Sequence, residues 1–308
     1  MLPIFLKTLP FFGLIALGYG AGRTRFFPEE ATAWLTKFVF FFALSAMLFR
    51  FSANLSLGDV LDWNFIQAYL AGSLVVYTLV TVVAMVRRLP TAEGAVEAQC
   101  AVIGNTGFLG VPMLTLLLGK AAIGPVMLVL AVDLMVFSSL IVIIINGSRD
   151  GRIAPGVLLT VGRGLLANPM IVSIVAGFAW AALKLPIPAP MEEFLTLLGS
   201  AATPGALFAI GASLASKTAE RLTVATWLAV CKLILHPLAV AVAALLIFNV
   251  ERFSAGVMIS AASLPVAGNV YMLAQHYRVA PHRASTAILV STAASILTLP
   301  AIIALVGG

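Results

Sequence analysis

The chain has 308 residues, of which 61% are hydrophobic and only 10% are charged, and its mean hydropathy is +1.09. A water-soluble protein of this length cannot cover so much apolar surface, so the composition excludes a soluble class and predicts a protein that uses lipid as its main solvent. The net charge of +6 includes no single basic cluster, and we therefore expect no nucleic-acid partner.

The apolar residues form long, unbroken runs, which favour membrane-spanning helices over the short alternating strands of a barrel. Ten runs are near the roughly 20 residues that a helix needs to cross a bilayer. They are Leu2–Ala21, Ala31–Phe49, Asn64–Val86, Glu97–Leu118, Ala122–Asn146, Asn168–Leu185, Phe194–Ala215, Thr223–Phe248, Phe253–His276 and Ala284–Val306. The connections are short, so we expect a single transmembrane domain over residues 1–308.

The first run has no basic segment before it and no small-residue cleavage site, so it reads as a mature helix and not as a signal peptide. Both cysteines, Cys100 and Cys231, fall inside runs and are expected to pack as small apolar residues. Asn168 and Pro169 are a good helix cap and a good first helical residue, which predicts the start of the sixth helix. The preceding stretch, Val157–Ala167, is expected to lie along the membrane interface.

Lysine and arginine are distributed unevenly between the two sides of the predicted helices. The odd-numbered connections and their flanks hold twelve of them: Arg23, Arg25, Lys37, Arg87, Arg88, Arg149, Arg152, Arg163, Lys217, Arg221, Arg278 and Arg283. The other side holds five: Lys7, Arg50, Lys120, Lys184 and Arg252. Because the basic side of a membrane protein faces the cytoplasm, we expect a multi-pass protein of the cell membrane with both termini outside the cytoplasm.

An internal comparison suggests two related halves, residues 1–146 and 155–308. Leu48-Phe49 in the second run matches Leu207-Phe208 in the seventh at an offset of 159, and Gly110 in the fourth run matches Gly268 in the ninth at an offset of 158. Five helices per half is an odd number, so the second half must enter the membrane from the opposite side. Inverted repeats of this kind are typical of secondary transporters.

The fourth and ninth runs each contain residues that interrupt a helix. Residues 103–112 hold three glycines, Asn105 and Pro112, while residues 263–269 hold Pro265, Gly268 and Asn269. An interruption at the bilayer midplane exposes free N–H groups at the start of the second half-helix, and these groups attract an anion. Paired interruptions are thus a pointer to a substrate site. The alternative is that these glycines and prolines serve only helix packing or kinks.

The residues that we expect to bind substrate surround these two interruptions. They are Asn105, Thr106, Gly107, Pro112, Pro265, Gly268 and Asn269, together with Ser45 of the second run. Ser45 is repeat-related to Pro204 at the offset of 159, and packing is an equally good explanation for it. No group of residues predicts a metal site or a cofactor.

Three ionisable residues lie inside the apolar runs, where charges are costly and usually functional. Asp133, His236 and Lys232 are candidates for coupling, and Asp133 is the candidate for carrying a coupling proton. Lys232 and His236 lie one turn apart in the eighth run. The alternatives are an Asp–Lys or Asp–His pair that ties two helices together, a snorkelling lysine, or a histidine that bonds only to a neighbouring backbone.

At four places, in order, the sequence resembles the auxin efflux carrier family of bacterial and plant transporters. These are residues 104–113 (GNTGFLGVPM), 201–214 (AATPGALFAIGASL), 232–238 (KLILHPL) and 263–277 (SLPVAGNVYMLAQHY). The resemblance implies an all-α fold of ten transmembrane helices in a 5+5 inverted repeat, with helices four and nine crossing. It also implies the fold of the bile-acid sodium symporters, elevator-type alternating access, homodimers and small organic anions as substrates. Examples of such substrates are auxin in plants and malonate or related carboxylates in some bacterial members.

The crossover prolines of the family correspond to Pro112 and Pro265, and its crossover asparagines to Asn105 and Asn269. The sequence departs from the family in two respects. The long cytoplasmic loop of plant exporters is reduced to about Gly147–Arg152, and Ser45 stands where proline is common. A bacterial-type carrier is therefore the better interpretation, and auxin specificity is not supported.

The leading hypothesis is a carrier of a small organic anion, coupled to protons through Asp133, coupled to sodium through groups such as Thr106 and Ser263, or not coupled. An enzyme is not expected, because the prenyl-transfer, GxSxG and HExxH motifs are absent and the three histidines are scattered. A channel or a sensor without transport is the other alternative, although a channel would more naturally repeat a filter around an oligomer axis.

Overall fold

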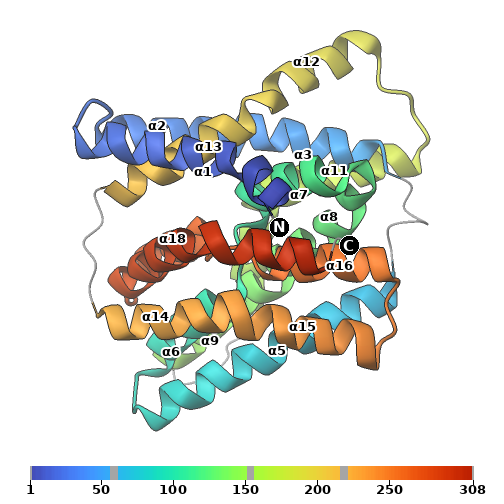
Figure 1. Ribbon diagram of the computed structural model, residues 1–308. Coiled ribbons are helices and arrows are strands. Elements are labelled where there is room, and N and C mark those ends of the chain that lie inside the picture. The colour runs from blue at the N-terminus through green and yellow to red at the C-terminus, as the bar shows by residue number, and fades with distance from the viewer. Residues whose placement is uncertain (1, 56–61, 151–155, 216–220, 307–308) are drawn as a thin grey trace.

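The computed structural model describes residues 2–55, 62–150, 156–215 and 221–306, and within these ranges it consists of helices and connecting turns with one isolated β-bridge, between Gly104 and Val266 (Figure 1). Seven helices in the described part are long and apolar enough to span a membrane, or eight if one pair bent by 70° forms a single span. This confirms the all-helical membrane class predicted from composition.

The N-terminal half contains five helical runs, several of them divided into segments. The elements are α1 (Leu2–Arg23), α2 (Glu29–Phe38), η1 (Val39–Ala43), α3 (Leu44–Ala53), α5 (Trp63–Val86), α6 (Thr91–Val102), η2 (Thr106–Gly110), α7 (Val111–Leu118), η3 (Lys120–Ala122), α8 (Ile123–Val132), η4 (Asp133–Phe137) and α9 (Ser138–Asp150). The η1, η2 and η4 segments are single π-helical turns, a form that is frequent at functional sites. Asp62 caps α5 by accepting from the backbone N–H groups of Asn64 and Phe65.

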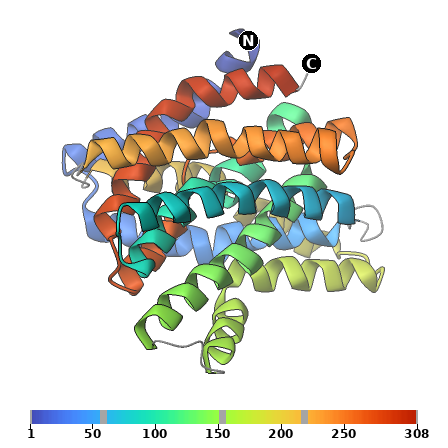
Figure 2. The same ribbon diagram turned by 90° about the horizontal axis from the view of Figure 1, so that it is seen from below.

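The C-terminal half is divided in a similar way. Its elements are α10 (Gly156–Ala167), α11 (Pro169–Ala182), α12 (Ala189–Ser200), α13 (Ala202–Ala215), α14 (Leu222–Val230), η5 (Cys231–Leu235), α15 (His236–Val242), η6 (Ala243–Ile247), α16 (Arg252–Ala262), α17 (Gly268–His276) and α18 (Pro281–Val306). Asn168 caps α11 through a 3.0 Å bond from the N–H of Met170, and Pro169 opens the helix, as the sequence predicts. The pair bent by 70° is α10 and α11, and α10 lies beside α9 (Figure 2).

The helices divide into two groups, which Figure 1 shows as an upper and a lower layer. The first group consists of α1, the α2–α3 run, α11 and the α12–α13 run, in which α1 packs on α13 and α11 packs on α3. The second group contains α5, the two interrupted runs α6–α7 and α16–α17, the α8–α9 run, the α14–η6 run and α18. Within it α5 packs on α6 and α15, and α14 packs on α18.

Glycines permit close approach at two equivalent places in the first group. A Cβ added to Gly18 of α1 would lie 2.1 Å from the carbonyl oxygen of Phe208 in α13. A Cβ added to Gly177 of α11 would lie 2.6 Å from the carbonyl oxygen of Phe49 in α3. The two glycines are 177 − 18 = 159 residues apart and the two phenylalanines are 208 − 49 = 159 residues apart. The same main-chain contact therefore occurs twice, with the offset that the sequence comparison gave for the second and seventh runs.

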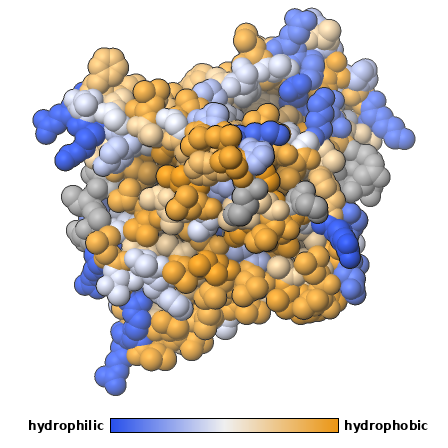
Figure 3. Space-filling model, in the orientation of Figure 1, coloured by the Kyte–Doolittle hydropathy of each residue, from blue (hydrophilic) through white to orange (hydrophobic). Residues whose placement is uncertain are grey.

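The surface is apolar over most of the face seen in Figure 3, and hydrophilic side chains gather mainly toward its left and right edges. Large apolar side chains are exposed along the spans, for example Phe42 at 60%, Leu246 at 75% and Val86 at 78%. Such exposure is expected of a protein that faces lipid. Of the basic residues used to predict orientation, Arg152 and Lys217 lie outside the described residues.

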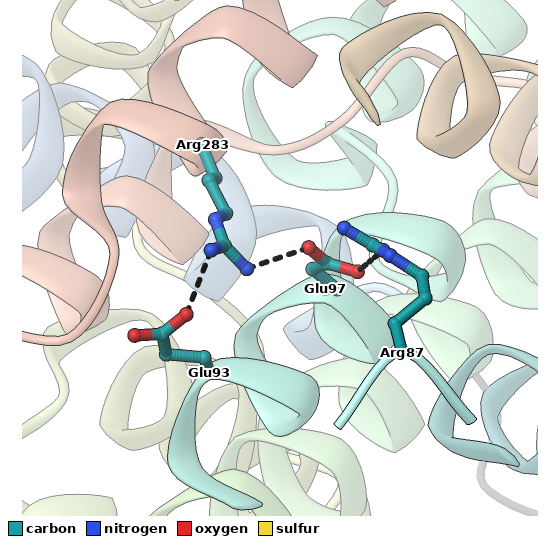
Figure 4. Close-up of polar contacts among 4 residues, drawn as sticks. All are labelled: Arg87, Glu93, Glu97 and Arg283. Carbon is teal, nitrogen blue, oxygen red and sulfur yellow. Dashed lines mark hydrogen bonds and ion pairs between the residues drawn. The ribbon is translucent and has the colours of Figure 1, made fainter. Parts of the chain in front are cut away.

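A cluster of four charged side chains joins α5, α6 and α18 (Figure 4). Glu97 of α6, only 1% exposed, binds Arg87 at 2.6 Å and Arg283 at 2.8 Å. Arg283 also binds Glu93 at 2.8 Å. These ion pairs fix the first half of the interrupted run α6–α7 to its neighbours in the second group.

Candidate functional site

The two interrupted runs meet at their breaks. The N–H of Asn105 donates to the carbonyl of Pro265 at 2.8 Å, and the N–H of Ala267 donates to the carbonyl of Ile103 at 3.1 Å. These reciprocal bonds form the antiparallel bridge between Gly104 and Val266. The N–H of Val266 donates to Ser291 Oγ of α18 at 3.1 Å. The backbone groups freed by the two breaks therefore hold each other in place.

Four half-helix ends converge around this bridge. The helices α6 and α16 end at Val102 and Ala262, while η2 and α17 begin at Thr106 and Gly268. No side chain caps the first turn of η2, which continues into α7, or the first turn of α17. The first N–H groups of a helix have no partner within it and carry its positive dipole end. The two starting turns are therefore suited to holding negative charge.

A cavity of about 520 Å³ lies against these starting turns. Asn105, Gly107 and Asn269 line it, and so does Asp133. The side-chain oxygens of Asn105 and Asn269 are buried and accept no hydrogen bond. Buried polar groups are normally paired, so these two amides have unused hydrogen-bonding capacity beside the cavity.

The rest of the cavity wall is mainly apolar and comes from both groups of helices. Phe40, Met170 and Ile171 belong to the first group, and Phe108, Leu130 and Leu134 belong to the second. Toward its mouth the cavity is lined by α10 and by the last turn of α17, where Thr160 and His276 are exposed.

The other predicted binding residues support the breaks or lie away from the cavity. The hydroxyl of Thr106 donates to Asp133 at 3.4 Å, and the carbonyl of Pro265 accepts from Asn105. A Cβ on Gly268 would meet no atom within 4 Å, so open space adjoins the start of α17. Pro112 lies in the first turn of α7. Ser45 donates to the carbonyl of Phe40 at 3.1 Å, across the π-helical turn η1.

Asp133 is held by hydrogen bonds from neutral groups and not by an ion pair. Its side chain is 2% exposed and accepts from the Tyr69 hydroxyl at 2.7 Å. Asp133 and Lys232 form no salt bridge within 4.0 Å among the described residues. The direct Asp–Lys or Asp–His pair considered from the sequence is therefore absent from the described part of the chain.

Lys232 and His236 form a second polar cluster beside the end of α16. Both are 0% exposed, so Lys232 does not snorkel. Its Nζ donates to the carbonyl of Ala262, and His236 Nδ1 lies 3.2 Å from both that carbonyl oxygen and Nζ. His236 Nε2 lies 2.9 Å from Ser73 Oγ of α5. Neither Lys232 nor His236 lines the cavity.

Three partners in these clusters were missed in the sequence: Tyr69, Ser73 and Ser291. Tyr69 and Ser73 are four residues apart on one face of α5, and a polar pair at that spacing in an apolar run was a usable signal. Ser291 carried no distinguishing pattern. No group of three or more His, Cys, Asp or Glu residues within the described ranges could hold a metal ion.

Comparison with known proteins identifies the family. The model of the family described as "Membrane transport protein" matches residues 3–303. The chain belongs to this family, the auxin efflux carrier family. A relative from Rhizobium meliloti (strain 1021), named provisionally as a malonate transporter, is 31% identical over 301 residues, which are 97% of this chain and 94% of the relative.

A second relative of this carrier family member is a lysosomal cholesterol signaling protein of Mus musculus. It is 29% identical over 252 residues, which are 76% of this chain but only 29% of the relative. The similarity to the mouse protein therefore concerns a minor part of that longer chain, while the bacterial relative matches from end to end.

Proposed function

We propose that this auxin efflux carrier family member is a secondary carrier of a small organic anion that binds where the two interrupted runs meet. The observation that carries the proposal is the pair of uncapped half-helix starts, each beside an asparagine amide, on one cavity. Each amide also supplies two N–H donors, and the helix starts supply backbone N–H groups and positive dipole ends. A carboxylate fits this set of donors.

The proposed architecture is ten transmembrane helices in a 5+5 inverted repeat. The described residues contain eight spans when the bent pair is counted as one. The interrupted runs α6–α7 and α16–α17 are the other two. The repeated contact of Gly18 with Phe208 and of Gly177 with Phe49 supports it, because exchanging the two halves exchanges these contacts.

The bridge between the breaks offers a different register for the proposed repeat. Its two reciprocal bonds are related by a local two-fold axis that pairs Gly104 with Val266, at an offset of 266 − 104 = 162. This is four residues more than the 158 suggested by matching Gly110 with Gly268. At the offset of 162, Gly107 corresponds to Asn269, and both line the cavity.

We propose elevator-type alternating access on the basis of the division into two groups. The second group carries both breaks, and the first group covers the cavity with Phe40, Met170 and Ile171. Sliding of the second group past the first would expose the same anion contacts first on one side of the membrane and then on the other. On the predicted orientation, the cavity mouth at α10 and the end of α17 faces the cytoplasm, in the cell membrane, with both termini outside. In a homodimer assembled through the first group, that group would stay fixed in the membrane while the second group moves.

The substrate class is a carboxylate, and the relative named for malonate makes malonate the first compound to test. The apolar wall of Phe40, Phe108, Leu130 and Leu134 also accommodates a monocarboxylate with an apolar body. Asp133 on the same wall disfavours a second negative charge close to it. A proton on Asp133 would relieve that repulsion, and this is how we propose that proton coupling works.

Flux into proteoliposomes tests the proposal. Malonate and an aliphatic or aromatic monocarboxylate are compared in wild type, Asn105→Ala and Asn269→Ala, with exposed Asn64→Ala as the matched control. A lost hydrogen bond to a charged group corresponds to about a tenfold fall in flux at low substrate concentration. Unchanged flux in both site variants would remove the site. Imposed gradients of pH and of sodium separate the proton route from the sodium route.

A sensor without transport is the second candidate, because a relative is named for cholesterol signaling. Saturable turnover of an anion supports the carrier. Binding of a sterol or an anion without any flux supports the sensor, and single-channel currents would instead indicate a channel.

A further inference from the structure

Lys232 has an ammonium group in the interior of the second group of helices, and the anion site does not use it. The side chain belongs to η5 and is fully buried, with 0% exposure. Burying a charge is costly unless it finds compensating partners. The groups around its Nζ therefore indicate what the charge does.

These groups are the ends of two interrupted helices. Nζ donates to the carbonyl of Ala262, which is the last residue of α16. A Cβ added to Gly104, two residues after the end of α6, would lie 3.3 Å from Nζ. The last carbonyls of a helix carry its negative dipole end. Lys232 thus places its ammonium group between the negative ends of α6 and α16; Gly104 also lines the anion cavity, whereas Lys232 does not.

The hydroxyls of Ser263 and Thr106, which are candidate sodium ligands, each donate a hydrogen bond and keep their oxygen lone pairs, so the carbonyls at the helix ends decide whether a cation position is open. The Ser263 hydroxyl donates to the carbonyl of Ser260 at 2.7 Å, and the Thr106 hydroxyl donates to Asp133. In secondary transporters, half-helix C-terminal ends and unwound carbonyls coordinate the coupling cation. Here an ammonium that is covalently part of the chain binds that position.

We propose that Lys232 is a built-in cation that takes the place of a dissociable coupling ion at the C-terminal ends of the interrupted helices. The carrier therefore has no sodium requirement. This inference rests on the proposed carrier function, since it assigns a role to a residue at the same crossing. It also decides between the coupling routes by removing sodium.

Thermal melting of the purified protein in detergent, followed by light scattering, tests the inference without any substrate. Wild type, Lys232→Ala and Lys232→Met are melted in sodium chloride and in choline chloride at equal ionic strength, and Lys232→Ala is also melted in methylammonium chloride. Ile234→Ala is the matched control, because Ile234 lies in the same π-helical turn but is 53% exposed.

We expect wild type and Ile234→Ala to melt at the same temperature in sodium and in choline. We expect Lys232→Ala and Lys232→Met to melt lower in choline, and Lys232→Ala to regain about 2–4 °C in sodium or methylammonium at roughly ten times the dissociation constant of the ion. Lys232→Met fills the same space with an apolar chain, so it should regain less.

Saturable stabilisation of wild type by sodium overturns the inference. An unchanged melting temperature of Lys232→Ala in choline also overturns it, and so does a lowered one that no monovalent cation raises. If both uncharged variants fail to fold, the sodium and choline comparison on wild type still decides the question. Anion flux is measured separately, so a carrier with sodium-dependent stability would refute the role of Lys232 and leave the proposed function intact.

Discussion

Replacing Glu97 by glutamine should destabilise the protein far more than the same change at Glu93. Glu97 is 1% exposed and binds two arginines, Arg87 at 2.6 Å and Arg283 at 2.8 Å, whereas Glu93 is 32% exposed and binds one arginine of the described residues, Arg283 (Figure 4). Glutamine keeps the shape of the side chain and one acceptor oxygen but removes the charge. Both substitutions leave Arg283 with one remaining carboxylate.

The magnitude follows from burial. Breaking a buried ion pair by removing one partner costs about 3–5 kcal/mol, because the other charge stays in a poor environment. Arg283 is 13% exposed and Arg87 is 31% exposed, so water relieves part of this cost, and we expect about 3 kcal/mol for Glu97→Gln. Exposed pairs contribute about 0–1 kcal/mol, so Glu93→Gln should cost less than about 1 kcal/mol.

The chain contains its own reporter for the measurement. Its two cysteines, Cys100 and Cys231, are free and 0% exposed, and Cys100 lies one turn after Glu97 on α6. In a Cys231→Ser background, the rate at which a thiol-reactive dye labels Cys100 reports the opening of α6. Labelling should become about a hundredfold faster in Glu97→Gln, since each 1.4 kcal/mol is a factor of ten, and less than about sixfold faster in Glu93→Gln. Equal acceleration in both variants would refute the reasoning from burial.

Two further predictions concern helix packing and capping. Gly211→Ala should lower the melting temperature by several degrees, because the added Cβ would lie 1.9 Å from the backbone oxygen of Ile15. Gly13→Ala is the control and should not lower it, because a Cβ added there would meet no atom within 4 Å. At the start of α16, Glu251 accepts hydrogen bonds from two backbone N–H groups, and these bonds hold the pKa of its carboxyl below the usual value. The small stabilising effect of the Glu251 carboxylate should therefore be present at neutral pH and disappear as acid protonates it. If the melting temperatures of Glu251→Gln and wild type differ by the same amount at every pH from 7 to about 3, the prediction is contradicted.

The secondary structure and the positions of the breaks could be predicted from sequence because the signals are local. Apolar runs give helices, and Asn168 with Pro169 marks the start of α11 through its own side chain and ring. Gly104 follows the end of α6 by two residues, and Pro265 follows the end of α16 by three. These are properties of a few consecutive residues, and no knowledge of packing is needed to infer them.

The partners of the buried polar groups could not be predicted, because they are far apart in the chain. Tyr69 binds Asp133 from 64 residues away, and Ser73 meets His236 from 163 residues away. Apolar helices resemble one another, so the sequence offers many equivalent ways to pack them. The same degeneracy affects the register of the proposed repeat at the breaks, where matching two glycines gives an offset of 158 and the hydrogen-bonded bridge pairs residues 162 apart.

The electrostatics of the crossing connect the two proposals. A broken helix has a negative end and a positive end at the break, and two such helices joined through Gly104 and Val266 bring together two ends of each sign. If all four were solvated by one cavity, their fields would largely cancel there. Lys232 neutralises the negative ends, so the positive ends at Thr106 and Gly268 act on the cavity with less opposition. On this reasoning an uncharged residue at position 232 weakens anion binding without touching the anion, and raises KM in Lys232→Met while the donors at Asn105 and Asn269 stay in place.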